Sequence, residues 1–230
     1  RCIPQLHGAV KKIFNDAGVT IEIEMNSCCD NPIVWHDLDE QEIISACNPD
    51  SSYVGLAMDT AAIAATNLAK MSERRNNRLV DGSLSGFPYF LIKEPGLNSG
   101  LMIPQYTQVG LLNDMRILSH PATTDNTPTC GNQEDYVAMG YNASKKALSI
   151  VDKLDFILAI ELLSVYYSYQ FLSKEKKRSL ACQEIINALG KSINIPSQDT
   201  YIYSFINTIK NIIHDGTLIE IVESKIGPLN

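Results

Sequence analysis

The sequence predicts an all-α protein built as a bundle of long helices. Apolar residues recur at helical spacing through most of the chain, whose 230 residues are 45% hydrophobic and 20% charged. Short polar segments rich in Gly, Pro, Asn and Asp separate these stretches, as connections between helices do. Several of the expected helices are apolar on more than one face, so we expect them to be buried in an oligomer.

The N-terminal part predicts one long helix followed by a turn. Leu6, Val10 and Ile13 lie on one face of a helix, and the apolar pattern continues beyond them. Pro32 disfavours helical geometry in the residue before it and predicts a turn. The segment Ile33–Ala46 then fits either a short hairpin or an irregular loop.

The middle and C-terminal parts return to helical periodicity. The second helix ends in the charged run SERRNNR, as expected where cations meet the negative end of a helix dipole. Pro104 suits the first turn of the third helix. The segment Gly131–Phe171 is expected to form one or two long helices. The other predicted helices are Pro4–Met25, Tyr53–Val80, Pro104–Leu118, Glu175–Leu189, Tyr201–His214 and Leu218–Ile226.

Composition excludes several classes of function. The net charge of -7 argues against a nucleic-acid surface. No apolar stretch approaches the roughly 20 residues of a membrane helix, and the best candidate, 156–165, contains Glu161. We therefore expect neither nucleic acid nor a membrane as a partner.

The cysteines do not form a metal-binding pattern. They lack CxxC spacing and partnered histidines, so no zinc or other metal site is expected. A chain of this length does not depend on disulfides, and free thiols in the reducing cytoplasm are the expected state. The six positions are Cys2, Cys28, Cys29, Cys47, Cys130 and Cys182.

The segment from Lys93 to Met139 is the strongest candidate for a functional site. It is dense in Gly, Pro, Asn, Gln and Thr, although strongly helical segments lie on both sides of it. A connection needs far fewer such residues, so their concentration predicts loops that serve a site.

Several motifs in the chain resemble those of the aromatic amino-acid ammonia-lyases, most closely the histidine ammonia-lyase members. They are RCIPQLHGAV, CDNPIV, MSERRNNRLVD, SLSGFPYFL, GLNSGLMIPQYT and HPATTDNTPTCGNQEDYVAMG. The resemblance extends from Arg1 to about Leu163. It implies a helical fold, a small amino acid as substrate and a homotetramer whose active sites draw residues from several subunits.

The resemblance also implies a cofactor that this chain does not encode. Family members use methylidene-imidazolone (MIO), an electrophile that forms from an Ala-Ser-Gly tripeptide. The nearest match here is Asn142-Ala143-Ser144-Lys145, in which Lys145 cannot replace the glycine whose nitrogen closes the ring. We therefore expect residues 1–230 to be a single helical unit, the C-terminal half of a larger lyase, and to be inactive alone.

Site residues carried over from the family lie in four motifs. Arg1 corresponds to the arginine that holds the substrate carboxylate, for which a guanidinium is well suited. Glu134 corresponds to the glutamate that faces the substrate side chain and could move a proton. Asn132 and Gln133 would supply amide groups to the same pocket. Asn48 would supply a further amide group, and Met102 would form part of the pocket wall.

Structural interpretations stand beside these assignments. Arg1 could simply be exposed, and Met102 could fill a core. Asn132 and Glu134 would also suit the N-terminus of a helix. His120 is expected to be structural.

One motif departs from the family. Around Asn48 the chain has Pro49, Asp50 and Ser52 where the family has Phe, His and Glu, which weakens the case for histidine as substrate. A tyrosine or phenylalanine lyase or aminomutase, or a non-catalytic helical homologue that acts as a binding module, is the alternative.

Overall fold

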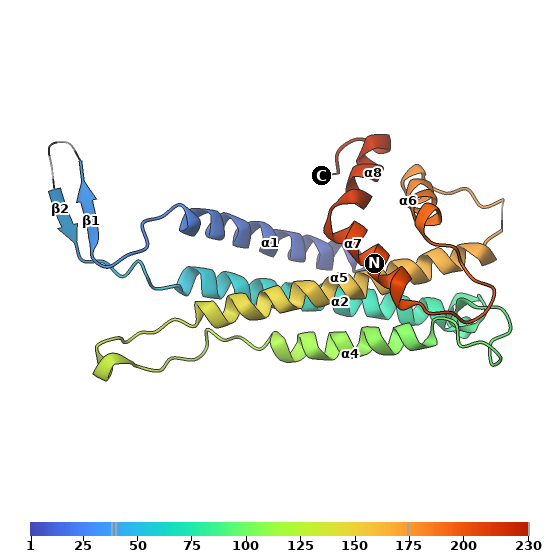
Figure 1. Cartoon of the computed structure of the whole chain (residues 1–230), viewed down its shortest axis with the longest axis horizontal. Coiled ribbons are helices and arrows are strands. Elements are labelled where there is room, and N and C mark those ends of the chain that lie inside the picture. Colours follow the sequence, from blue (N-terminus) through green and yellow to red (C-terminus); the bar gives the residue numbers. More distant parts are fainter. Residues whose placement is uncertain (38, 40, 174, 230) are drawn as a thin grey trace. The chain divides into compact units, whose positions relative to one another are not determined.

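The computed structural model describes residues 1–37, 39, 41–173 and 175–229 (Figure 1). It divides the chain into two compact units. Unit 1 comprises residues 1–68 and 115–151, and unit 2 comprises residues 69–114 and 152–230. The expectation of a single helical unit concerns how these two parts are joined, and it stays a prediction.

The predicted all-α class is confirmed, since helices dominate the described residues and the strands are short. Helices α2, α4 and α5 each contribute residues to both units. The helices are α1 (Ile3–Met25), α2 (Ser52–Val80), α3 (Gly82–Ser85), α4 (Met102–Leu118), α5 (Gly140–Ser168), α6 (Leu180–Ser192), α7 (Tyr203–His214) and α8 (Thr217–Ile226), with 3-10 turns η1 (Tyr89–Leu91), η2 (Cys130–Asn132) and η3 (Tyr169–Phe171).

In unit 1, α1 is followed by a two-stranded hairpin, drawn in blue in Figure 1. Strands β1 (Ile33–His36) and β2 (Gln41–Ile44) pair antiparallel, with Ile33 opposite Ile44. Residues 38 and 40 of the predicted segment 33–46 lie outside the described residues. The base of the hairpin is fixed by Asn31, whose side-chain oxygen accepts a hydrogen bond from the Ala46 N–H at 3.2 Å.

Unit 2 contains a continuous hydrophobic core. Side chains from the second half of α5 pack against α6, α7 and the turn after α2, while α8 packs on α6 and α7. The hydroxyl of Tyr166 donates to the carbonyl of Ile193 at 3.0 Å, which joins α5 to the end of α6. The buried members are Val80, Leu91, Leu101, Ala159, Ile160, Leu163, Tyr166, Tyr167, Leu189, Ile193, Ile206 and Ile209.

The charged run of α2 lies near the C-terminus of the helix, as predicted, and two of its polar residues are buried. Glu73 and Asn76 are 3% and 1% exposed. Asn76 donates to Gln108 of α4 at 2.8 Å, and Gln108 donates to the Ile157 carbonyl of α5 at 3.0 Å. These polar residues therefore join three helices inside unit 2, where burial requires each to find a partner.

The same segment also forms an ion pair with α5. Arg75 donates two hydrogen bonds, of 2.5 and 2.8 Å, to the carboxylate of Glu161 on α5. This pairing explains how α5 accommodates a carboxylate within its apolar run. Gln105 of α4 donates to Asn77 of α2 at 2.8 Å, which also joins these two helices.

The helix predicted over Gly131–Phe171 begins nine residues later than expected, at Gly140. Residues 131–139 are instead held by hydrogen bonds within the loop, to Asn126 and Thr129, which helical periodicity does not reveal. Helix α6 begins at Leu180 rather than at Glu175, because the Ser179 side chain accepts a hydrogen bond from the Cys182 N–H and starts the helix there.

Candidate functional site

The starts of α2 and α5 meet within unit 1 at two glycines. A Cβ atom on Gly140 would lie 2.2 Å from the Ser51 hydroxyl oxygen. A Cβ on Gly55 would lie 2.8 Å from the Thr123 methyl group and 3.1 Å from the Gly140 Cα. Only glycine permits these approaches, which bring the loop before α5 against the start of α2.

Asp59 of α2 anchors the first part of this loop. Its Oδ2 accepts hydrogen bonds from the Thr123 N–H and the Thr123 hydroxyl, both at 2.9 Å. Its Oδ1 lies 3.2 Å from the Lys146 ammonium, an ion pair without the alignment of a good hydrogen bond. Lys146 also donates to the His120 carbonyl, so α2, the loop and α5 share one polar node.

Burial and pairing act in opposite directions on Asp59, which is 4% exposed. Burial raises the pKa of its carboxyl group, whereas the Thr123 hydrogen bonds and the Lys146 charge lower it. Together the lowering effects win, and the pKa lies below the ordinary value of 3.8. Asp59 is therefore ionised at neutral pH and paired with Lys146.

The second part of the loop closes on itself. Thr129 and Glu134 exchange backbone hydrogen bonds of 3.0 and 3.3 Å. Asn126 donates to the Asp135 carboxylate at 3.0 Å and accepts from the Val137 N–H at 2.8 Å. These contacts fix the backbone on either side of Glu134.

The tip of the loop carries consecutive left-handed residues. Cys130, Gly131 and Asn132 have φ values of 51°, 64° and 68°. Glycine and asparagine tolerate this region, but cysteine does so at a cost. Such strain is typical of segments that present a site, and here it places Gln133 and Glu134 directly after the turn.

Glu134 lines a cavity of about 230 Å³ in unit 1. The loop faces the segment before α2 across this cavity, and both segments contribute carboxylates. No Lys, Arg or His is among the described residues that line it, which makes its charge negative. The lining residues are Cys47, Pro49, Asp50, Ser51, Thr129, Glu134, Tyr136, Val137 and Ala138.

The other predicted site residues lie outside this lining. Arg1 is exposed ahead of α1. Asn48, which directly precedes Pro49, donates its amide to the Cys28 carbonyl at 3.0 Å, leaving its side-chain oxygen free for another donor. Asn132 and Gln133 are exposed in the loop, next to Glu134. The predicted helix N-terminus at Asn132 and Glu134 is wrong, because α5 begins at Gly140.

Met102 belongs to unit 2, where it opens α4 and is partly buried. Asp199 holds the loop before it, since its two carboxylate oxygens accept from the Ser99 and Gly100 N–H groups at 2.8 Å each. These hydrogen bonds, of which the one from Ser99 has the larger effect, hold the pKa of Asp199 below its usual 3.8. The loop that leads into α4 is thus fixed by a residue 100 positions after Ser99.

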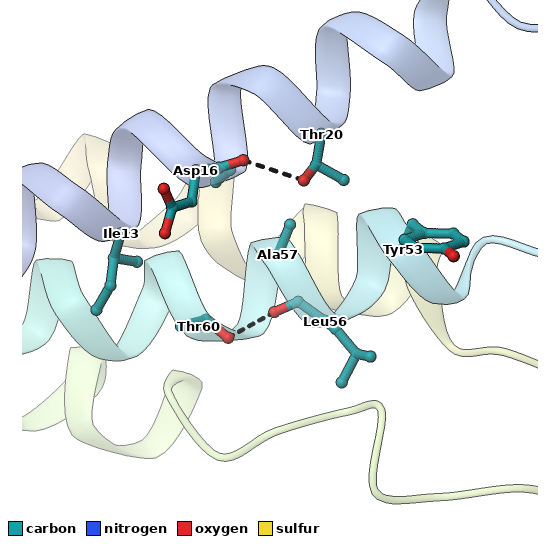
Figure 2. Close-up of a pocket in the computed structure, with 8 residues that line it drawn as sticks. Ile13, Asp16, Thr20, Tyr53, Leu56, Ala57 and Thr60 are labelled. Carbon is teal, nitrogen blue, oxygen red and sulfur yellow. Dashed lines mark hydrogen bonds between the residues drawn. The ribbon is translucent and has the colours of Figure 1, made fainter.

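A second hollow in unit 1, of about 280 Å³, runs between α1 and α2 and contains none of the predicted site residues (Figure 2). The hydroxyls of Thr20 and Thr60 donate to carbonyls of their own helices, at 3.0 and 2.7 Å. The Asp16 carboxylate pairs with Lys12 at 2.5 Å. With these polar groups already bonded, the hollow offers mainly apolar surface.

The structure gives no precursor for an MIO group in this chain. Ala143 is fully buried in α5, and the Ser144 hydroxyl donates to the Gly140 carbonyl at 2.8 Å, as in a regular helix. These residues do not fit the group. No cluster of metal-ligating side chains occurs among the described residues, whose six cysteines are free and exposed. None of the described helices combines the length and apolar character that a membrane crossing requires.

Sequence reasoning missed four residues that shape this site: Asp59, Lys146, Asn126 and, as a lining carboxylate, Asp50. A signal for Asp59 was present, since an aspartate within the alanine-rich part of α2 would be buried and would need a partner. Asp50 was noted only as a departure from the family.

Comparison with known proteins shows extensive similarity. Residues 1–191 match the family described as aromatic amino acid lyase. A histidine ammonia-lyase of Caldanaerobacter subterraneus subsp. tengcongensis is 39% identical over 225 residues, which cover 98% of this chain and 44% of that protein. The chain therefore spans less than half the length of the curated relatives it matches.

Solved structures show the same fold. A histidine ammonia-lyase from Trypanosoma cruzi superposes with a TM-score of 0.92 at 30% identity, covering 97% of this chain and 44% of that one. A tyrosine aminomutase from Streptomyces globisporus superposes with a TM-score of 0.90 at 29% identity, covering 98% of this chain and 42% of that one.

Proposed function

Because this chain belongs to the aromatic amino acid lyase family, we propose that it is the C-terminal part of an ammonia-lyase that eliminates ammonia from histidine to give urocanate. The observation that carries the proposal is the cavity beside the fixed Thr129–Glu134 loop, with Glu134 in its lining. Its carboxylate can accept a hydrogen bond from an imidazole N–H of the substrate.

Each site residue then has a distinct role. Glu134 would orient the substrate imidazole and hold or move a proton at its ring nitrogen. Arg1 would bind the substrate carboxylate through two parallel hydrogen bonds. Gln133 and Asn132 would offer amide groups at the loop tip, and the free side-chain oxygen of Asn48 could accept from a donor on the substrate.

The reaction also needs an electrophile that these residues do not supply. In the family this electrophile is an MIO group, which would activate the amino group of the substrate for departure, but its Ala-Ser-Gly precursor is absent from this sequence. The residues of this chain are therefore assigned only to binding, orientation and proton transfer. Met102, in unit 2, is proposed as part of the pocket wall.

We further propose a cytoplasmic homotetramer that acts on a small amino acid. Large apolar side chains stay exposed along unit 1, such as Met25 at 80% and Leu148 at 67%. Surfaces of this kind are typical of helices that other subunits cover.

The likeness to a tyrosine aminomutase supports a second candidate. In that case the substrate is tyrosine, and Pro49 and Asp50 reflect a different side-chain pocket. Assays with both amino acids distinguish the candidates, since urocanate absorbs in the ultraviolet and can be followed directly.

The test uses the intact gene product and the 230-residue chain in parallel. We expect the intact protein to form urocanate from histidine and the chain alone to form none. Absence of lyase and aminomutase activity in the intact protein would favour a non-catalytic helical homologue. Urocanate formation by the chain alone would contradict the need for an external electrophile.

A further inference from the structure

We infer that Asp50 is a second specificity-determining carboxylate, which with Glu134 selects a substrate side chain that is cationic or rich in N–H donors over a neutral aromatic ring. The inference rests on the proposed function and deepens it. At the level of sequence, Asp50 weakened the case for histidine because it replaces a family histidine. In the structure it lines the same cavity as Glu134.

Asp50 is positioned by the helix that follows it. Its Oδ1 accepts a hydrogen bond from the Ser52 N–H at 2.9 Å, in the first turn of α2, which leaves Oδ2 for another donor. The residue is partly buried between the hairpin and α2. A carboxylate fixed in this way loses little conformational freedom when it binds a ligand.

Glu134 reaches the cavity from the opposite segment. Its backbone is fixed by the bridge to Thr129, while its carboxylate has no hydrogen bond or ion pair to any other described residue. The remaining titratable groups of the lining are the Cys47 thiol and the Tyr136 phenol. Two carboxylates without a lining cation favour a positive ligand, because charges of one sign in a cleft reinforce each other.

The size of the cavity suits one side chain rather than a larger ligand. Its volume of about 230 Å³ lies below the roughly 300–1,000 Å³ of pockets for drug-sized molecules. Pro49 lines the cavity where the family has an aromatic ring, which removes a flat surface on which a phenyl or phenol ring would stack. Imidazolium, which donates from both nitrogens, suits a pair of carboxylates.

The experiment compares Asp50→Asn with Asp125→Asn in the intact protein. Asparagine retains an oxygen for the Ser52 N–H, so the helix start is preserved, and Asp125 is an exposed loop carboxylate outside the cavity. We expect Asp50→Asn to raise the KM for histidine about tenfold with a smaller change in kcat, and to leave the KM for tyrosine unchanged. Asp125→Asn should have the same KM values as the parent for histidine and for tyrosine.

The pH dependence gives a readout that a purely structural role would not produce. The side chain of free histidine has a pKa of about 6.5, so it is more often positive at pH 6 than at pH 8. The increase in the KM for histidine caused by Asp50→Asn should therefore be larger at pH 6. Asp50→Glu, which keeps the charge, should retain the preference for histidine. Equal KM increases for both amino acids, or a preference lost in Asp50→Glu as well, would overturn the inference.

A binding measurement separates this inference from the proposed function. If the intact protein turns over neither amino acid, the proposed function fails, and ligand-observed NMR with imidazolium chloride and phenol at pH 6 decides the inference. We expect Asp50→Asn to weaken imidazolium binding about tenfold and to leave phenol binding unchanged. Unchanged imidazolium binding would overturn the role of Asp50.

Discussion

Unit 2 buries its large apolar side chains, whereas unit 1 leaves many of its own exposed. In unit 2, Leu163, Ile160 and Ile209 are at most 1% exposed and belong to one continuous core. In unit 1, Ala62, Ala65 and other alanines supply much of the buried apolar surface. Small side chains let helices approach closely but bury little area, so each contributes less hydrophobic free energy.

The difference separates the scaffold from the part that carries the proposed site. Unit 2 has the packing of a self-sufficient core, and its polar residues join helices. Unit 1 has close glycine contacts, the Asp59 node and a strained loop around Glu134, together with exposed apolar surface. The free energy of unfolding should thus depend most on unit 2, and catalysis most on unit 1.

The largest effect on stability is expected from Leu163→Ala. Removing this fully buried side chain leaves a cavity in the unit 2 core and should lower the free energy of unfolding by about 4 kcal/mol. Leu148→Ala, at a position of the same helix that is exposed in the single chain, should change the free energy of unfolding of the isolated 230-residue chain by less than about 0.5 kcal/mol. Chemical denaturation measures the free energy of unfolding of both variants, and similar losses would contradict the proposed difference between the units.

The second-largest loss of stability is expected when the Asp59 node of unit 1 is disrupted. Asp59→Asn leaves the Lys146 ammonium without its carboxylate and should cost about 3 kcal/mol. Hydrogen exchange in residues 120–139 should accelerate, because Asp59 anchors Thr123. Unchanged exchange in that loop would show that the node does not position it.

The low pKa of Asp59 adds a dependence on acid. Its contribution is present above the unfolded value near 3.8 and is lost as pH falls through the lower folded value. Asp59→Asn should therefore lose less stability than the parent protein between pH 5 and about pH 2.

A smaller loss of stability is expected from Gly140→Ala. The new methyl group would clash with Ser51 and force the starts of α2 and α5 apart, at a cost of about 2 kcal/mol. Gly110→Ala, on α4 with open space around its Cα, is the matched control and should be neutral or slightly stabilising. Thermal melting compares the two variants, and equal melting temperatures would argue against the close contact.

The smallest effect is expected from Tyr167→Phe. Burial raises the pKa of Tyr167 to about 12, and its buried hydroxyl has no hydrogen-bond partner among the described residues. The variant should lie within about 1 kcal/mol of the parent at pH 7. The parent keeps the contribution of the protonated phenol below pH 10 and loses it as pH rises through about 12, so Tyr167→Phe should resist alkaline unfolding better.

Local periodicity was enough to predict most of the fold, because amphipathic spacing reports which face of a helix is buried. The start of α1 and the ends of α2 and α4 fall within two residues of the prediction. The segment 131–139 was misassigned, since its conformation depends on Asn126 and the Thr129–Glu134 bridge, whose hydrogen bonds leave no helical or strand period.

The candidate site could be predicted only in part. Motif resemblance identified Glu134, but the cavity that it shares with Asp50 depends on two segments more than 80 residues apart. The roles of Glu134, Arg1, Asn48, Asn132, Gln133 and Met102 all stay predictions, and of these residues Glu134 lines the cavity.

The most direct test of the division between site and scaffold is Glu134→Gln in the intact protein, assayed on histidine and tyrosine and measured for stability. We expect kcat/KM for histidine to fall about 100-fold, the value for tyrosine to fall much less, and the free energy of unfolding to stay within about 0.5 kcal/mol of the parent. Equal losses on both amino acids, or a histidine loss explained by unfolding, would contradict the placement of substrate recognition in the unit 1 loop.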